Sequence, residues 1–171
     1  AQVQALHGIR VLDLGQVMAG PFCAMQLADL GADVIKVEPP EGDSSRHMGT
    51  RVGADSTGFA AVNRGKRGIV LDLKTAPGRD ALIRLSDRAD VLIENFRPGV
   101  MRRLGLGPDD VTHANPGLVY CSLPGFASDD PRAHLAAREG VLGAATGTYW
   151  DATGARFTAL PISSTFGGRA A

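Results

Sequence analysis

The chain has 171 residues, enough for one domain of ordinary size with a fragment of a second. Hydrophobic residues make up 44% and charged residues 21%, which predicts a packed globular core and excludes a disordered chain. The 18 basic and 18 acidic residues cancel, so no net field favours binding to nucleic acid or to a membrane.

The first half of the chain alternates short apolar segments with helical patterns. Residues 8–14 predict a buried strand, and an apolar helical pattern follows from Ala19 to Gly31. Residues 33–38 predict a second strand, which Pro39-Pro40 ends. Residues 41–58 are rich in Gly, Ser, Thr and Asp, so we expect a mobile loop there, with a helical turn at 59–62.

The alternation continues through the middle of the chain. Strands are predicted at residues 68–73, 90–94 and 118–123. A helix is predicted at 75–89, with Thr75 as its N-cap, and two short helices at 100–104 and 108–114. Strands separated by helices indicate parallel pairing with right-handed crossovers. We therefore predict an α/β fold with an open, mainly parallel, Rossmann-like sheet and helices on both faces.

The pattern weakens after Pro124. Residues 132–146 have helical spacing, and residues 157–162 predict a strand or an extended loop. We expect one domain over residues 1–126 and its continuation over 127–171, interrupted at the opening of another helix. The chain is thus expected to be part of a longer protein.

Cysteine usage and hydropathy indicate a cellular compartment. Cys23 and Cys121 lie in apolar stretches and are too few for a disulfide framework, so a reduced, buried pair is expected. No run of about 18 apolar residues is present, and the N-terminus lacks the apolar core of a signal peptide. We expect a cytoplasmic protein with no membrane partner.

Ligands of open α/β sheets bind beyond the carboxyl ends of the strands. Here those ends carry residues 15–20, Glu38-Pro39, Lys74 and residues 95–98. The first loop lacks GxGxxG, which disfavours a nicotinamide or flavin cofactor, and GxxxxGK[ST] is absent, which excludes a P-loop nucleotidase. No GxSxG elbow of an α/β-hydrolase is present either.

Two basic clusters lie near predicted strands. Residues 63–67 (NRGKR) place three cations beside a glycine, which suits either a phosphate site or a solvated turn. Arg97, Arg102 and Arg103 follow the fourth predicted strand, and together the basic sites suit a ligand with several phosphates. The four histidines are scattered, so no metal site is expected.

Glu139 is the only acidic residue of the predicted helix at 132–146. It is a candidate for a catalytic carboxylate, and the alternative is a solvent-facing helix residue. No Asp or Glu follows residue 151, so any other carboxylate must come from earlier in the chain, from sequence outside it, or from a partner.

Four ordered blocks resemble the class III coenzyme A (CoA) transferases, a family that also contains the α-methylacyl-CoA racemases. The blocks are GIRVLDLGQVMAGPFCAMQLADLGADVIKVEPPEGD, NRGKRGIVLDLKTAPGRDALIRL, ADVLIENFRPGVMRRLGLG and NPGLVYCSLPGF. The resemblance is dense over residues 8–126 and looser over 132–168.

The resemblance implies substrates, partners and contacts. The substrates would be an acyl-CoA and a small carboxylic acid, with no tightly bound cofactor. The family forms interlocked homodimers, so we expect a homodimer or association with a second transferase half. The residues that match the family's CoA contacts are Val17, Met18, Ala19, Leu71, Asp72, Leu73, Lys74, Asn95, Phe96, Arg97 and Arg103.

The resemblance also implies a mechanism and exposes a departure from it. In the transferases an Asp attacks the thioester carbonyl, forming a mixed anhydride that passes through an enzyme–CoA thioester to the acceptor acid. The matching position here is Ser163, or Thr165 in a looser match to the racemases, and the racemase His falls at Arg138. The four blocks do not separate a transferase from a racemase, so an acyl-CoA racemase is a further alternative, although its Asp–His pair is missing. Glu139 matches an acidic position of the transferases.

Three interpretations of this departure follow. The chain is a non-catalytic, CoA-binding half of a tandem or heteromeric transferase. Alternatively, it is a divergent transferase that uses another carboxylate, such as Glu139. Thirdly, it is a variant engineered at the nucleophile.

Overall fold

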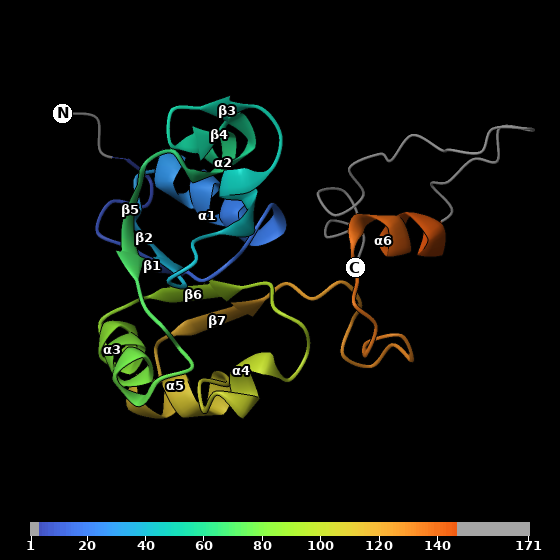
Figure 1. Cartoon of the computed structure of the whole chain (residues 1–171). Coiled ribbons are helices and arrows are strands. Elements are labelled where there is room, and N and C mark those ends of the chain that lie inside the picture. Colours follow the sequence, from blue (N-terminus) through green and yellow to red (C-terminus); the bar gives the residue numbers. More distant parts are fainter. Residues whose placement is uncertain (1–3, 147–171) are drawn as a thin grey trace, which may run out of the picture. The chain divides into compact units, whose positions relative to one another are not determined.

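The computed structural model describes residues 4–146 (Figure 1). The chain divides into two compact units, Ala1–Leu123 and Pro124–Ala171. The first unit contains a five-stranded sheet, and the second contains helix α6 (Glu139–Ala145).

The sheet of the first unit is parallel throughout, with the strand order β5-β2-β1-β6-β7. The chain runs outward from β1 to β5 and then returns to the other side of β1 with β6 and β7. This reversal between β1 and β6 is the topological switch point of a Rossmann-like sheet, and it confirms the predicted fold class. The strands are β1 (Arg10–Asp13), β2 (Asp33–Glu38), β5 (Lys66–Val70), β6 (Val91–Glu94) and β7 (Val119–Ser122).

Helices cover both faces of the sheet (Figure 1). One face carries α1 and α2, and the other carries α3, α4 and α5. Because successive strand residues point to opposite faces, Val11 and Leu12 of β1 enter two separate apolar clusters. The helices are α1 (Ala19–Asp29), α2 (Thr57–Asn63), α3 (Ala76–Ser86), α4 (Val100–Arg103) and α5 (Pro108–Ala114).

The prediction of an irregular loop at residues 41–58 is wrong. The segment contains a 3₁₀ helix, η1 (Ser44–His47), and an antiparallel hairpin of β3 (Arg51–Val52) and β4 (Asp55–Ser56). Asp43 caps η1 by accepting the Ser45 N–H, and both side chains are buried. Polar residues of this kind organise a backbone through local hydrogen bonds, which hydrophobic periodicity does not detect.

The observed bounds of one strand and one helix differ from the predicted ones. Strand β5 begins two residues before the prediction and ends at Val70, so residues 71–73 belong to a loop. Helix α6 covers only the second half of the pattern at 132–146, because Arg138 is extended at its N-cap. The predicted segment 157–162 lies outside the described residues.

Two further expectations can be compared with the structure. The Thr75 hydroxyl accepts the Gly78 N–H at 3.2 Å, which confirms Thr75 as the N-cap of α3. Cys23 and Cys121 are free thiols, but they are half-buried rather than buried. Among the helices of residues 4–146, none is long and apolar enough to cross a lipid bilayer.

Candidate functional site

A cavity of about 260 Å³ lies at the carboxyl ends of four strands, next to the switch point. Its walls come from the loops that follow β1, β2, β5 and β6, and from helix α4. The lining residues are Leu14, Gln16, Val37, Pro39, Glu41, Leu71, Asp72, Leu73, Lys74, Phe96, Val100 and Leu104.

The cavity is apolar inside and polar at its margin. Leucine and valine side chains and the Phe96 ring provide the walls, whereas Gln16, Glu41, Asp72 and Lys74 provide polar groups. Lys74 is exposed, and its backbone N–H donates to Asp72 Oδ1 at 3.0 Å. A pocket with apolar walls and few polar groups suits an organic ligand with a flat or aliphatic part.

The expected CoA-contact residues fall into two groups. Leu71, Asp72, Leu73, Lys74 and Phe96 line the cavity, so the structure brings together segments that follow two different strands. The other six do not line it: Val17, Met18, Ala19, Asn95, Arg97 and Arg103.

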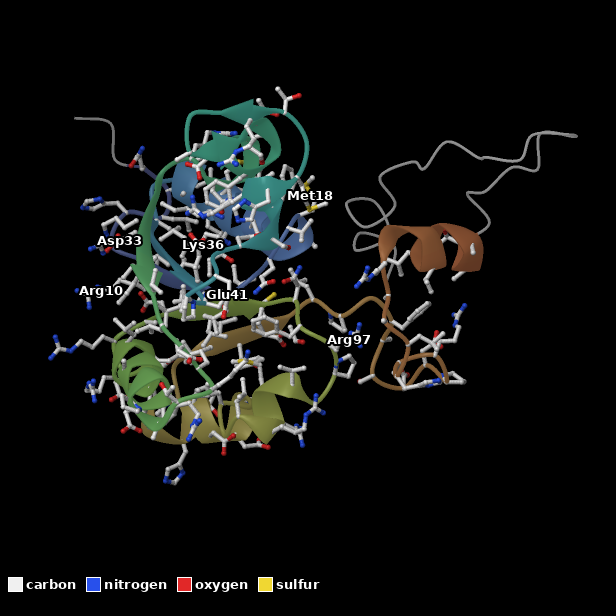
Figure 2. All side chains as sticks on the ribbon, in the orientation of Figure 1. Arg10, Met18, Asp33, Lys36, Glu41 and Arg97 are labelled. Carbon is white, nitrogen blue, oxygen red and sulfur yellow. The ribbon has the colours of Figure 1, made fainter. Side chains whose placement is uncertain are left out.

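Three cations at this edge of the sheet are unpaired. Among residues 4–146, the structure shows no ion pair for Lys74, Arg97 or Arg103, and all three side chains are exposed. Figure 2 shows Arg97 at the carboxyl side of the strands, opposite Arg10 and Asp33. Their charges are therefore available to an anionic ligand.

The cations of residues 63–67 are instead neutralised. Arg64 pairs with Asp29 at 2.5 Å and Arg67 with Asp33 at 2.7 Å, both in exposed positions. The side chain of Lys66 is buried, and its Nζ lies 2.7 Å from the carboxylate of Asp13. The structure thus supports a structural role for this cluster rather than a phosphate site.

The loop between β1 and α1 passes beside the cavity in a conformation that few residues adopt. A Cβ atom on Gly15 would lie 2.6 Å from the Cα of Gly20, so the two glycines allow the chain to turn back on itself. Val17 has a φ of 66°, the left-handed region that β-branched residues disfavour. Contacts elsewhere in the fold must therefore hold Val17 in a backbone conformation that valine disfavours.

Buried charges on the α1 face of the sheet hold that loop. Lys36, labelled in Figure 2, is almost fully buried. Its Nζ donates to the Gly15 carbonyl at 2.8 Å and pairs with Asp43 at 2.9 Å. Asp13 Oδ1 accepts the Gly15 N–H at 2.9 Å, and Asp43 accepts the Val17 N–H at 3.2 Å. The backbone of the loop is therefore held by hydrogen bonds to paired, buried charges on the α1 face of the sheet.

Two carboxylates in this region, those of Asp43 and Glu38, stay ionised because of their surroundings. Burial opposes ionisation of Asp43, but Lys36 and the hydrogen bonds from Ser45 outweigh it and hold the pKa below its ordinary value. The same holds for Glu38. Burial acts to raise its pKa, but the opposing effect of Arg46 and of the hydrogen bond from the Asp43 N–H is larger, so the pKa lies below its ordinary value. Both groups are consequently anions at neutral pH.

The strand-end rule identified part of the lining that family resemblance did not supply. Gln16 lies three residues after the end of β1, Pro39 directly follows β2, and both line the cavity. Val100 and Leu104 carry no such signal, because α4 reaches the cavity only through tertiary packing. In the part of the chain that the structure describes, no group of three His, Cys, Asp or Glu gathers as a metal site.

The catalytic candidates lie apart from this cavity in the sequence. Glu139 is the first residue of α6, in the second unit. Ser163 and Thr165 lie outside the described residues, so their roles stay predictions.

Comparison with known proteins identifies relatives of the chain. A family model described as CoA-transferase family III matches residues 6–161. The chain is 46% identical over 141 residues to acetyl-CoA:oxalate CoA-transferase of Acetobacter aceti, covering 82% of this chain and 36% of that protein. It is 47% identical over 141 residues to succinyl-CoA:mesaconate CoA-transferase of Haloarcula hispanica, covering 80% and 35%.

Solved structures agree with the sequence relatives. The crystal structure of Rv3272 from Mycobacterium tuberculosis superimposes with a TM-score of 0.86 and 36% identity, covering 98% of this chain and 49% of that one. The chain therefore spans about a third of the length of the two curated relatives and about half of the crystallised one.

Proposed function

Because the chain belongs to CoA-transferase family III, we propose that it binds the CoA part of an acyl-CoA thioester at the carboxyl edge of its parallel sheet. The observation that carries this proposal is the cavity lined by residues 71–74 and Phe96. These residues come from two loops that the resemblance assigns to CoA.

The chemistry of the cavity and its margin matches two parts of the nucleotide end of CoA, the adenine ring and the phosphates. The apolar walls suit the adenine ring, which loses unfavourable contact with water when it is enclosed. The unpaired charges of Lys74, Arg97 and Arg103 suit its phosphates, since charge-assisted hydrogen bonds to phosphate are stronger than neutral ones. The paired cations at 63–67 have no part in this proposal.

We further propose that binding serves the transfer of CoA between an acyl-CoA and a carboxylic acid through an acyl-enzyme anhydride. In that step a carboxylate attacks the thioester carbonyl, and the thiolate of CoA leaves. By the resemblance, Ser163 matches the position of the usual Asp, so we propose Glu139 as the candidate carboxylate within this chain. We propose either a homodimer or a pairing with a second transferase half as the assembly.

The serine at position 163 also supports a second candidate function. A serine hydroxyl is a weak nucleophile without an adjacent base, and we identify no His that the sequence places to activate Ser163. The chain would then be a CoA-binding or scaffolding half, and a partner would supply the nucleophile.

Calorimetric titration with CoA at low salt tests the binding proposal. We expect a Kd of roughly micromolar to millimolar. Lys74→Ala should weaken binding by about three- to tenfold, because one phosphate loses its cation. Arg67→Ala is the matched control, since it also removes one exposed cation but from an existing pair, and its Kd should stay within about twofold. No heat of binding for the unaltered chain would refute the proposal.

Turnover separates the two candidate functions. Acetyl-CoA and succinyl-CoA are offered with oxalate or mesaconate, the substrates in the relatives' names. A transferase that uses Glu139 should survive Ser163→Ala and lose activity in Glu139→Gln. Unchanged turnover in Glu139→Gln would argue against a catalytic Glu139, and no turnover in a chain that binds CoA would favour the non-catalytic half.

A further inference from the structure

We propose that Asn95 is a positioning residue, which holds Gln16 against the ligand cavity rather than offering its own amide to the ligand. The inference deepens the proposed function and rests on it, because the ligand in question is CoA. It names Gln16 as the side chain through which the switch point contacts that ligand.

The hydrogen bonds of Asn95 carry the inference. Its Oδ1 accepts the Gln16 N–H at 2.7 Å, and its Nδ2 donates to the Gln16 carbonyl at 2.9 Å. Both ends of the side-chain amide are thus engaged by one backbone residue, 79 positions away in the sequence. These two bonds fix the orientation of the amide against the loop, and one N–H and one lone pair of the amide remain for other partners.

Gln16, unlike Asn95, lies where it can contact a ligand in the cavity. It lines the cavity and is half-buried, whereas Asn95 does not line it. Since β1 and β6 are neighbours, their carboxyl ends meet at the switch point, and the Asn95–Gln16 contact joins the loops that follow them. The side-chain amide of Gln16 can both donate and accept there.

The neighbours of Gln16 show why it needs this support. The N–H groups of Gly15, Gln16 and Val17 donate to three different side chains, namely Asp13, Asn95 and Asp43. Asp13 and Asp43 belong to the buried charge network on the α1 face, whereas Asn95 holds Gln16 from the residue that directly follows β6. Without it, Gln16 loses both bonds to Asn95 and keeps the bond from the Met18 N–H to its carbonyl at 3.0 Å, while the residues on either side remain anchored. Ordering Gln16 is then a cost of binding.

The chain contains a matched control in Asn115. It is also half-buried, and its Nδ2 donates to the backbone carbonyls of Ser86 at 2.9 Å and Ala89 at 2.8 Å. It precedes β7, at the amino edge of the sheet, away from the cavity. Asn115→Ala therefore removes the same kind of bonds without touching the loop.

The test compares Asn95→Ala with Asn115→Ala in the full chain. We expect both to lower the melting temperature, but only Asn95→Ala to weaken CoA binding, by about five- to tenfold. Amide hydrogen exchange at Gln16 should accelerate in Asn95→Ala alone. Equal Kd values for the two variants would overturn the inference, and so would unchanged exchange at Gln16.

A double-mutant cycle separates positioning from direct contact. If Asn95 acts through the side chain of Gln16, adding Asn95→Ala to Gln16→Ala should change the Kd by less than about twofold. Additive losses would mean that Asn95 contacts the ligand itself, which would overturn the inference. If the unaltered chain binds no CoA, the proposed function fails and the ligand part of the inference fails with it, while exchange at Gln16 still decides whether Asn95 anchors the loop.

Discussion

At the level of single residues, Val17 shows how the site is built against local preference. It is the only non-glycine residue with positive φ among residues 4–146. Such strain is found where the surroundings overdetermine the backbone, and it often marks a functional site. Here the surroundings are the charge network beneath the loop and the Asn95–Gln16 contact beside it.

Replacing Val17 with glycine should stabilise the fold. A β-branched residue at φ 66° is strained by about 1–3 kcal/mol, whereas glycine adopts this region freely but loses about 0.5–1 kcal/mol in chain entropy. We expect Val17→Gly to raise the free energy of unfolding in urea by about 1 kcal/mol. Val70→Gly, at an exposed strand position, is the control and should lower the free energy of unfolding. A loss of stability in Val17→Gly would argue against backbone strain at Val17.

The lowered pKa of Asp43 predicts an acid limit to stability. A carboxyl group whose folded pKa lies below its unfolded value contributes stability that is present above the unfolded pKa and lost as pH falls through the folded one. The ordinary value is 3.8, so the loss should occur below about pH 4. We expect unfolding free energies measured between pH 6 and 2 to fall less steeply in Asp43→Asn than in the unaltered chain. The same fall in both proteins would argue that the pairing of Asp43 with Lys36 does not contribute to stability.

At the level of elements, the segment between β2 and β5 is more ordered than its composition suggests. Ser56 ends β4 and caps α2: its hydroxyl accepts the Phe59 N–H at 3.0 Å and donates to the Ser45 carbonyl at 2.5 Å. One buried side chain thereby joins η1, the hairpin and α2. The same region bears the pair of Arg46 with Glu38, and Arg46 lies over the Phe59 ring at 3.7 Å.

Ser56→Ala should therefore cost more than the loss of an ordinary helix cap. The change removes a cap and leaves the buried Ser45 carbonyl without that donor, so we expect a destabilisation of about 2 kcal/mol. Thr57→Ala, one residue along and exposed, is the control and should stay within about 0.5 kcal/mol. Thermal denaturation of both variants measures the difference, and equal melting temperatures would refute the role assigned to Ser56.

At the level of the whole molecule, the cavity belongs to one compact unit. All five sheet strands and every cavity-lining residue fall within Ala1–Leu123. Glu139 and Ser163 fall in the second unit by sequence. Binding and chemistry are thus assigned to different parts of the chain in the proposed function.

A chain of residues 1–123 should fold and keep the binding site. It retains both apolar clusters on the two faces of the sheet, so we expect cooperative thermal unfolding and a Kd for CoA within about threefold of the full chain. Circular dichroism and calorimetry provide the measurements. A non-cooperative transition would show that the second unit is needed for folding, and a large loss of affinity in a folded chain would place part of the CoA site beyond Leu123.

Much of the fold could be predicted because its signals are local. Alternating strand and helix patterns predicted the parallel sheet, with β2 and α5 at their observed bounds. The start of β5 was misplaced because Lys66 and Arg67 look like turn residues. In the structure, Lys66 is buried against Asp13, and that burial allows a charged residue to begin a strand.

The sequence by itself determined the α/β class, the family and the loops that surround the cavity, because periodicity and motif order are written along the chain. Only the tertiary structure decided which cations are free and which side chain anchors Gln16. The partners of Arg64, Arg67 and Asn95 lie 34 to 79 positions away. Such pairings depend on which strands become neighbours, and that is settled when the apolar faces of the sheet are buried.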